Sequence, residues 1–531
     1  MSVPDSANRQ IARAAGTVMV AIVFGQVMSL LRSMLVARAF ALGELDAFYA
    51  ANRVSETLFT LIAAGALGSA FLPTFTGFLV KGEKTAAWKL AVSMANLVTL
   101  ALSLLAAIAA WFAPQIVRHL LAPGLFYNFT LYNLTIDLLR IQLISSVLFG
   151  LGGLVVSILN AHQVFFIPQL TASMYQIGQI FGVLVLARWL GIYGLAWGVV
   201  IGAALYLLIQ LPTLSKLAPL SARRLLMTDY WALFTDSAVR QVITLMVPRV
   251  LGAGVVQLNF WVNAWLASQM RPGSYTGLVY GFALMLMAQA AIAQSVAIAV
   301  MPTFSAQFAL GKVDEMRHAL ASALRGMLLF AVPASVGLIV LRQPIIAMLY
   351  QRGEFTETST EMVAWALLWY AAGMVGHSVM EVLTRAFYAQ QDTKTPVVIG
   401  AIAMGLNVGF SFAFSAWFGQ IGRMPHGGLA LANSLATALE ATVLFLVMRR
   451  RLGGIEGRLL LDGGTRIGAA AIGMGLALMA WIQWSAGQNP WLSGLGGVAV
   501  GGLVYALGVV ILKIPEVQSI LALIKQKIPG R

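Results

Sequence analysis

The sequence predicts an all-α polytopic membrane protein, and three observations support this. Of its 531 residues, 60% are hydrophobic and only 10% are charged, and the mean hydropathy is +0.84. A soluble domain is about 45–50% apolar and about 25% charged, so a soluble fold is excluded. Apolar segments of about 20 residues, the length that crosses a bilayer, recur along the chain. The absence of cysteine excludes disulfides and thiolate metal sites.

The apolar segments predict about 14 transmembrane helices. They lie near residues 16–42, 47–80, 90–113, 135–160, 168–190, 193–214, 237–268, 275–308, 319–341, 360–388, 397–418, 428–448, 466–485 and 492–512. With 14 crossings, both termini lie on the same side, and the loops on that side hold 20 lysines and arginines against 6 on the other. Because basic loops stay in the cytoplasm, both termini are predicted to be cytoplasmic. The net charge of +15 then reflects topology, and no nucleic-acid partner is expected.

Two pairs of similar segments indicate an internal repeat. The segment "FLPTFTGFLVKGEKTAAW" aligns with "VMPTFSAQFALGKVDEMR", which places Pro73 on Pro302, and "LNAHQVFFIP" aligns with "FYAQQDTKTP", which places Pro168 on Pro396. The offsets, 229 and 228 residues, are nearly equal. They predict a duplicated six-helix unit, and an even number of helices gives both copies the same orientation, related by an axis along the membrane normal. Substrate is expected to bind between the copies.

This repeat divides the chain into four parts. We expect an N-terminal six-helix lobe at 1–215, a cytoplasmic linker at 216–236, a C-terminal six-helix lobe at 237–450, and an appended pair of helices, 13 and 14, with a cytoplasmic tail at 451–531. The glycine-rich runs "GVVIGAAL" and "GLGGVAVGG" lie inside spans and predict close helix packing. No GxxxxGK[ST] or HExxH motif is present, so we expect a transporter with no cofactor, metal or catalytic residue.

Arginines inside predicted spans are the most informative charged residues. Arg32 and Arg53 lie within the first two helices, where an unpaired charge is costly, so they are expected to line a water-filled cavity. A guanidinium group suits phosphate oxygens, which indicates an anionic substrate. Alternatively, these arginines pair with Asp46 or Glu56, or extend to an interface. Arg38, near its helix end, is expected to extend to the interface.

Two further sets of polar residues are candidates. Arg249 in the seventh helix precedes Gln257, Asn259 and Asn263, which could bind a sugar or peptide headgroup or could hydrogen-bond between helices. In the tenth helix, three ionisable residues spaced four apart share one face: His377, Glu381 and Arg385. They form a candidate coupling site for a proton or cation. The alternative is a local ion pair between Glu381 and Arg385, with His377 near the outer interface.

Several motifs resemble the MurJ (MviN) family of lipid II flippases, which belongs to the multidrug, oligosaccharidyl-lipid and polysaccharide exporter superfamily. They are "LVARAFALGELDAFYAANRV", "GALGSAFLPTF", "LAPG", "YQRGEFT" and "FYAQQDTKTPV", in the family's order, and the similarity extends from the first to about the twelfth helix. The resemblance implies a V-shaped pair of six-helix lobes in the bacterial cytoplasmic (inner) membrane. It also implies alternating access that carries an undecaprenyl-diphosphate-linked saccharide-peptide to the outer leaflet, for peptidoglycan biosynthesis.

The resemblance assigns Arg32 to the family's cavity arginine in the first helix, Asp46 to its acidic position, and Arg53 to a basic position. The chain departs from the family where Gln26, Phe59 and Ala283 stand in place of arginines, and where Ala64 stands in place of a glutamate. We therefore keep three functions open: a lipid II flippase, a flippase for another polyprenyl-diphosphate-linked glycan, or an ion-coupled exporter of small amphipathic cations. A non-transporting scaffold is a further alternative. The expected partners are the lipid-linked substrate, membrane lipids and a monovalent cation, and a monomer is expected.

Overall fold

The computed structural model describes residues 5–61, 67, 70–218 and 237–514, and this part of the chain is helical without strands. It divides into two compact units, Met1–Gly273 and Ser274–Arg531. The predicted fold class, an all-α polytopic membrane protein, is confirmed. Within the described residues, 11 helices are long and apolar enough to cross a membrane, or up to 12 if the bent helix α13 is one span. The total of 14 stays a prediction.

The first unit is built from long helices joined by short helical segments. Its α-helices are α1 (Asp5–Ala39), α2 (Leu42–Phe59), α3 (Leu72–Val80), α4 (Lys84–Trp111), α5 (Ala113–Gln115), α6 (Phe129–Ala161), α7 (Phe166–Phe181), α8 (Ala187–Leu190), α9 (Ile192–Leu208), α10 (Leu211–Leu217) and α13 (Ser237–Ser268). Its π- and 3₁₀-helices are η2 (Ile116–Leu121), η3 (Pro123–Tyr127) and η4 (Gly182–Leu186). Helix α13 bends by 46° between Val247 and Gly252.

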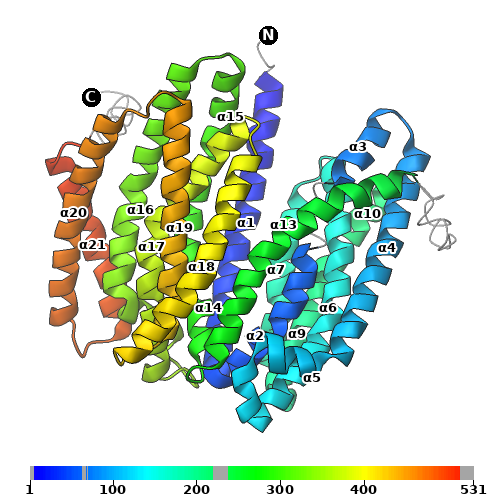
Figure 1. The fold of residues 1–531 in the computed structure, drawn as a ribbon, viewed down its shortest axis with the longest axis horizontal. Coiled ribbons are helices and arrows are strands. Elements are labelled where there is room, and N and C mark those ends of the chain that lie inside the picture. Colours follow the sequence, from blue (N-terminus) through cyan, green and yellow to red (C-terminus); the bar gives the residue numbers. More distant parts are fainter. Residues whose placement is uncertain (1–4, 62–66, 68–69, 219–236, 515–531) are drawn as a thin grey trace. The chain divides into compact units, whose positions relative to one another are not determined.

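The second unit contains α14 (Ser274–Gln289), η5 (Ala290–Gln294), α15 (Ser295–Ala309), α16 (Val313–Tyr350), α17 (Glu357–Ala389), α18 (Lys394–Gln420), α19 (His426–Arg451), α20 (Gly457–Trp484), η6 (Leu492–Gly496) and α21 (Gly497–Ile511). Helix α17 packs against α14, α16 and α19. Helices α20 and α21 pack against each other and attach to the unit through α16 (Figure 1). They correspond to the predicted appended pair.

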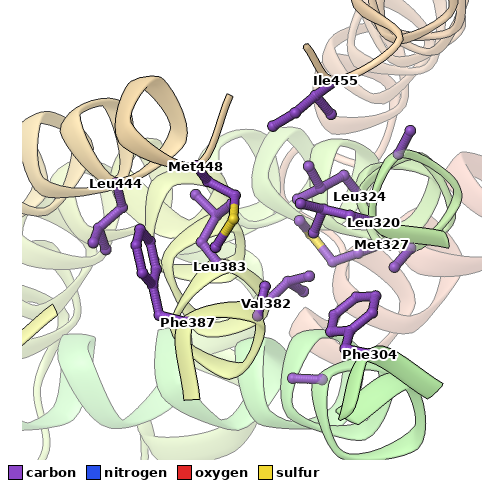
Figure 2. Packing of buried hydrophobic residues seen from close by; sticks show 14 of the residues in the cluster. Phe304, Leu320, Leu324, Met327, Val382, Leu383, Phe387, Leu444, Met448 and Ile455 are labelled. Carbon is purple, nitrogen blue, oxygen red and sulfur yellow. The ribbon is translucent and has the colours of Figure 1, made fainter. Parts of the chain in front are cut away.

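Each unit has its own apolar core. In the second unit, Figure 2 shows Phe304 of α15, Met327 of α16, Phe387 of α17 and Met448 of α19 packed together. In the first unit, Phe75 of α3 packs on helix α4. Because lipid tails are as apolar as these side chains, close van der Waals packing, rather than removal from water, stabilises such a core inside a membrane.

Glycines bring α7 and α9 into backbone contact. A Cβ atom on Gly178 would lie 2.2 Å from the Cα of Gly202, and one on Gly182 would lie 2.6 Å from the carbonyl oxygen of Gly194. Gly198 lies between them on α9 and faces Gly182. This confirms the predicted packing role of "GVVIGAAL", which begins at Gly198. It also explains why small residues recur every fourth position here, since larger ones would separate the helices.

The local backbone repeats at the two offsets found in the sequence. After α3, Gly82 has a φ of +79° and the N–H of Glu83 donates to Phe78; after α15, Gly311 has a φ of +66° and Lys312 donates to Gln307. After α6 and after α17, residues 163 and 391 are both glutamines with a φ of +59°. These matching turns support the duplication. The axis relating the copies stays a prediction.

The contacts place the boundary between the units at Gly273, so α13 is grouped with the first unit. The predicted linker at 216–236 lies largely outside the described residues, as do Ala64 and residues 515–531 of the tail. The predicted lobes 1–215 and 237–450 therefore stay a prediction.

Candidate functional site

A polar seam joins α2 and α13 within the first unit. The guanidinium of Arg53 forms an ion pair with Glu56 at 3.1 Å and lies over the ring of Phe260, 4.9 Å from its centre. The Trp261 indole N–H donates to the Thr57 hydroxyl at 2.9 Å. Only 13% of the Arg53 side chain is exposed. The structure contains the pairing of Arg53 with Glu56, which the sequence offered as the alternative to a cavity-lining role; the cavity-lining role stays a prediction.

Helical spacing explains why these side chains meet. Residues 53, 56 and 57 share one face of α2, because positions three and four apart are neighbours on a helix. Residues 257, 260 and 261 repeat the same spacing on α13, and Gln257 contacts Thr57 across the seam at 3.4 Å. Two complementary faces thus bring a cation, a carboxylate, an amide and two aromatic rings into one site.

Asp46 anchors the start of α2 to the end of the first unit. Its carboxylate accepts a hydrogen bond from the backbone N–H of Gly273 at 2.5 Å, and only 5% of the residue is exposed. Gly273 has a φ of +94°, which only glycine adopts at little cost. Asp46 therefore holds the backbone at the end of the first unit.

Arg32 of α1 is held by neutral partners. Its two terminal nitrogens donate to the Gln179 side chain on α7 at 3.2 Å and to the Ser33 hydroxyl at 3.1 Å. Its Nε is buried and has no partner in the described part of the chain. No carboxylate neutralises Arg32 among the described residues, so its positive charge is available to an anion.

The remaining predicted residues of α13 are a buried asparagine pair and an exposed arginine. The amide of Asn263 donates to Asn259 at 3.3 Å, and both residues are buried. Arg249 is exposed and has no hydrogen bond or ion pair within the described residues. The asparagine pair thus lies along α13 itself, one helical turn apart.

The positions that depart from the family are not basic, and the structure shows what they contact. Gln26 is exposed on α1, and Phe59 packs against the ring of Phe149, 5.0 Å away. Ala283 is an exposed position of α14 in the second unit. Arg32 and Arg53 are therefore the arginines of the predicted set that the structure places inside the first unit, while Arg249 is exposed.

The predicted stripe on α17 divides into two separate interactions. Glu381 and Arg385 form an ion pair at 3.0 Å within the helix. The His377 Nε2 donates to Asn433 on α19 at 3.1 Å and is buried against Phe282. Glu381 therefore has a permanent positive partner, and His377 contacts a neighbouring helix instead of Glu381.

Glu440 is an ionisable residue that was not among the sequence-predicted sites. It is the single acidic residue in α19, and it is 9% exposed. An isolated acid within an apolar span was the sequence feature that could have identified it.

A cavity of about 730 Å³ lies within the second unit. Helices α16, α17, α19 and α20 contribute apolar side chains to it, together with Arg449 and Arg458. Neither arginine has an ion pair among the described residues. An apolar cavity with two cationic groups suits an amphipathic anion.

The fold and these sites are those of a helical membrane transporter: both units contain apolar helices long enough to cross a membrane, and partly buried arginines lie on α1 and α2. The family model "Lipid II flippase MurJ" matches residues 36–494. The chain belongs to this family of transporters, which act in the bacterial inner membrane and catalyse no chemical reaction. The family predicted from the sequence motifs is confirmed.

Named relatives agree with this assignment. The chain is 29% identical to a lipid II flippase MurJ of Burkholderia cenocepacia over 477 residues, covering 88% of each chain. It is 26% identical to a probable lipid II flippase MurJ of Vibrio cholerae over 502 residues, covering 90% of this chain and 91% of the relative.

Solved structures show the same fold. A lipid II flippase MurJ in an inward closed conformation matches with a TM-score of 0.75 at 24% identity, covering 93% of this chain and 98% of that one. A MATE family multidrug transporter of the MOP superfamily, in an inward-facing conformation, matches with a TM-score of 0.67 at 15% identity, covering 81% and 94%. At these identities the likeness establishes the fold alone.

Proposed function

We propose that this protein translocates lipid II, the undecaprenyl-diphosphate-linked peptidoglycan precursor, from the cytoplasmic to the outer leaflet by alternating access. The observation that carries the proposal is the family match across residues 36–494, together with relatives aligned along nearly their whole length. Both termini are then cytoplasmic, as the distribution of basic loops indicates. The substrate and the surrounding membrane lipids are its partners, and it acts as a monomer.

Arg32 is our candidate for the first contact with the diphosphate. A guanidinium has five N–H donors, and two of the Arg32 nitrogens are held by neutral oxygens. No carboxylate among the described residues pairs with this charge, so phosphate oxygens gain a full charge-assisted hydrogen bond there. Gln179 orients the group without competing for the anion.

Arg53 is assigned a second contact that opens on binding. Without substrate, Glu56 satisfies its charge at 3.1 Å. A diphosphate oxygen can replace the Glu56 carboxylate because half of that side chain, 48%, is exposed and can turn to solvent. Phe260 keeps the guanidinium in place while its partner changes.

A flippase for another polyprenyl-diphosphate-linked glycan is the second candidate. The observation that favours it is the replacement of expected arginines by Gln26, Phe59 and Ala283, which leaves fewer cations for the anionic headgroup. An exporter of amphipathic cations is disfavoured, because Asp46 is bonded to Gly273 while Glu56 and Glu381 are paired with arginines.

Complementation of a MurJ-depleted bacterium tests the proposal. We expect the wild-type chain to restore growth, Arg32→Ala to fail, and Arg38→Ala to restore it, because Arg38 is an exposed arginine in the last turn of the same helix. Immunoblots of membrane fractions confirm equal insertion. Failure of the inserted wild-type chain would reject lipid II and favour the other glycans. Equal rescue by both variants would reject the assigned role of Arg32.

We also propose that the six-helix lobes, 1–215 and 237–450, are related by an axis along the membrane normal and joined by the cytoplasmic linker 216–236, with 451–531 appended. An experimental structure tests this by superposing one lobe on the other, with Pro73 and Pro302 at equivalent places. An inverted relation between the lobes would refute it.

A further inference from the structure

Glu440 is a carboxylic acid in the interior of a membrane-spanning helix with no polar partner. It lies 11 residues before the last residue of α19, which places it roughly 16 Å from the helix end. Its side chain is 9% exposed. It has no hydrogen bond or ion pair in the described part of the chain, and no lysine, arginine or histidine nitrogen there lies within 4.0 Å of its oxygens.

The carboxyl group faces α18 at a glycine. A Cβ atom built on Gly400 would lie 3.1 Å from the Glu440 Oε1, so even an alanine there would contact the carboxyl group too closely. Helices α18 and α19 form a closely packed antiparallel pair, and at its outer end Gly428 contacts the backbone of Phe414. These two contacts fix how the facing residues align.

The alignment places a row of buried polar residues beyond Glu440 on the same seam. Thr437 lies one turn before Glu440 on α19, and Asn407 and Ser411 lie two and three turns beyond Gly400 on α18. Ser411 donates to the Asn407 oxygen at 3.3 Å, but the Asn407 amide nitrogen is buried without a partner among the described residues. The unpaired Asn407 amide would be satisfied by a hydrogen bond to a water molecule.

The charged and titratable groups around Glu440 are either engaged elsewhere or far along a helix. On α17, His377 donates to Asn433, and Glu381 pairs with Arg385. Helix α18 offers Lys394, which is exposed at its first residue, and α14 offers only tyrosines. The other titratable groups on α19 itself lie near its two ends: His426, Arg449, Arg450 and Arg451.

An ionised carboxylate in this environment would be uncompensated, and membrane interiors rarely hold such a charge. A metal cation needs several oxygen ligands, and the described residues contain no group of three acidic or histidine side chains to supply them. A proton needs only the one carboxylate. A single carboxylate without a second acid beside it therefore suits a proton better than a metal cation, and the proton converts it into a neutral carboxyl group without any further reactant.

We propose that Glu440 is a proton-binding site of the second unit, and that its loading and release along the α18–α19 seam couple a proton gradient to transport. The binding of the proton stands on the surroundings of Glu440 alone. The coupling rests on the proposed function. The two statements are tested separately.

Carbodiimide labelling tests proton binding without any substrate. Dicyclohexylcarbodiimide reacts with protonated carboxyl groups in apolar surroundings, and mass spectrometry of the purified full-length protein locates the adduct. We expect modification of Glu440 at neutral pH, its loss in Glu440→Gln, and no change in Glu361→Gln, which removes an exposed acid from the same unit. An unmodified Glu440 at neutral and at acidic pH would overturn the proton site.

Vesicles with an imposed pH gradient test the coupling. We expect the gradient to accelerate translocation of fluorescent lipid II by the wild type and by Glu361→Gln, whereas Glu440→Gln loses this acceleration and Glu440→Asp keeps part of it. Thermal unfolding of each variant in detergent shows whether it is folded. A gradient response in Glu440→Gln equal to that of the wild type would overturn the coupling. Absence of all translocation by the wild type, with Glu440 still labelled, would instead refute the proposed function.

Discussion

The close approach of α7 and α9 makes Gly178→Ala a severe test of how the first unit is packed. The added methyl carbon would lie 2.2 Å from the Cα of Gly202 and 2.3 Å from its nitrogen. Carbon atoms rest about 3.5–4.0 Å apart, so the helices must separate locally by about 1.3 Å or more. The obstructing atoms are backbone and cannot rotate away.

The expected loss of stability follows from two opposing effects. Overpacking of this kind costs about 1–3 kcal/mol, and we expect the upper end because no side chain can yield. Alanine in place of glycine stabilises a helix by about 0.5–1 kcal/mol. The variant should therefore be less stable by about 2–2.5 kcal/mol. Transport should fall as well, because α7 carries Gln179, which orients Arg32.

Thermal unfolding of the purified protein in detergent measures the effect. Gly405→Ala is the matched control: Gly405 also lies inside a spanning helix, α18, but a Cβ there meets nothing within 4 Å. We expect Gly405→Ala to unfold at or above the wild-type temperature and Gly178→Ala clearly below it. If Gly178→Ala matched its control, the backbone contact between α7 and α9 would be refuted.

Two more predictions concern the second unit. Glu381→Gln should lower the free energy of unfolding by about 1–2 kcal/mol, because the half-buried Arg385 loses its partner, and transport should fall with it. Reduced transport with an unchanged unfolding free energy would instead support a coupling role for Glu381. In the loop before α18, hydrogen bonds from the Thr395 hydroxyl and N–H, with the Arg451 guanidinium, lower the pKa of Asp392 to about 2. Because this pKa is depressed, the stabilisation is present at neutral pH and is lost as pH falls below about 4 towards 2. Asp392→Asn should therefore lower the unfolding temperature at neutral pH and make it depend less on pH below about 4. An unfolding temperature that falls with pH as steeply as that of the wild type would refute this.

Composition and local motifs were sufficient to predict the class of fold and the family. An apolar fraction of 60% leaves no alternative to membrane helices, and the repeated proline and turn motifs predicted where the backbone geometry recurs. The glycine run at Gly198 likewise indicated close helix packing, since only small residues permit it. These features depend on residues that are close together in the sequence, so the sequence alone is enough to predict them.

The partners of the buried charges could not be predicted in the same way. Asp46 is bonded to Gly273, 227 residues away, and Arg32 to Gln179, 147 residues away. Which of several plausible partners a charge takes depends on tertiary packing, and helical spacing says nothing about it. The Glu381–Arg385 pair, by contrast, was predicted as an alternative because both residues lie on one helix, four apart.

The repeat shows that the two copies have diverged in charge. Counting 229 residues forward from Arg53 leads to Phe282, so the second copy has an aromatic ring where the first has a cation. The last spans of the two copies, Ile192–Leu217 and His426–Arg451, begin 234 residues apart, so Glu440 corresponds to Tyr206 and the first copy has no acid at this place. A duplicated protein with the same charge pattern in both halves would bind the same kind of ligand at two sites. Because the first copy keeps the arginine and the second keeps the acid, anion recognition and proton binding are assigned to different halves, as coupling between two distinct sites requires.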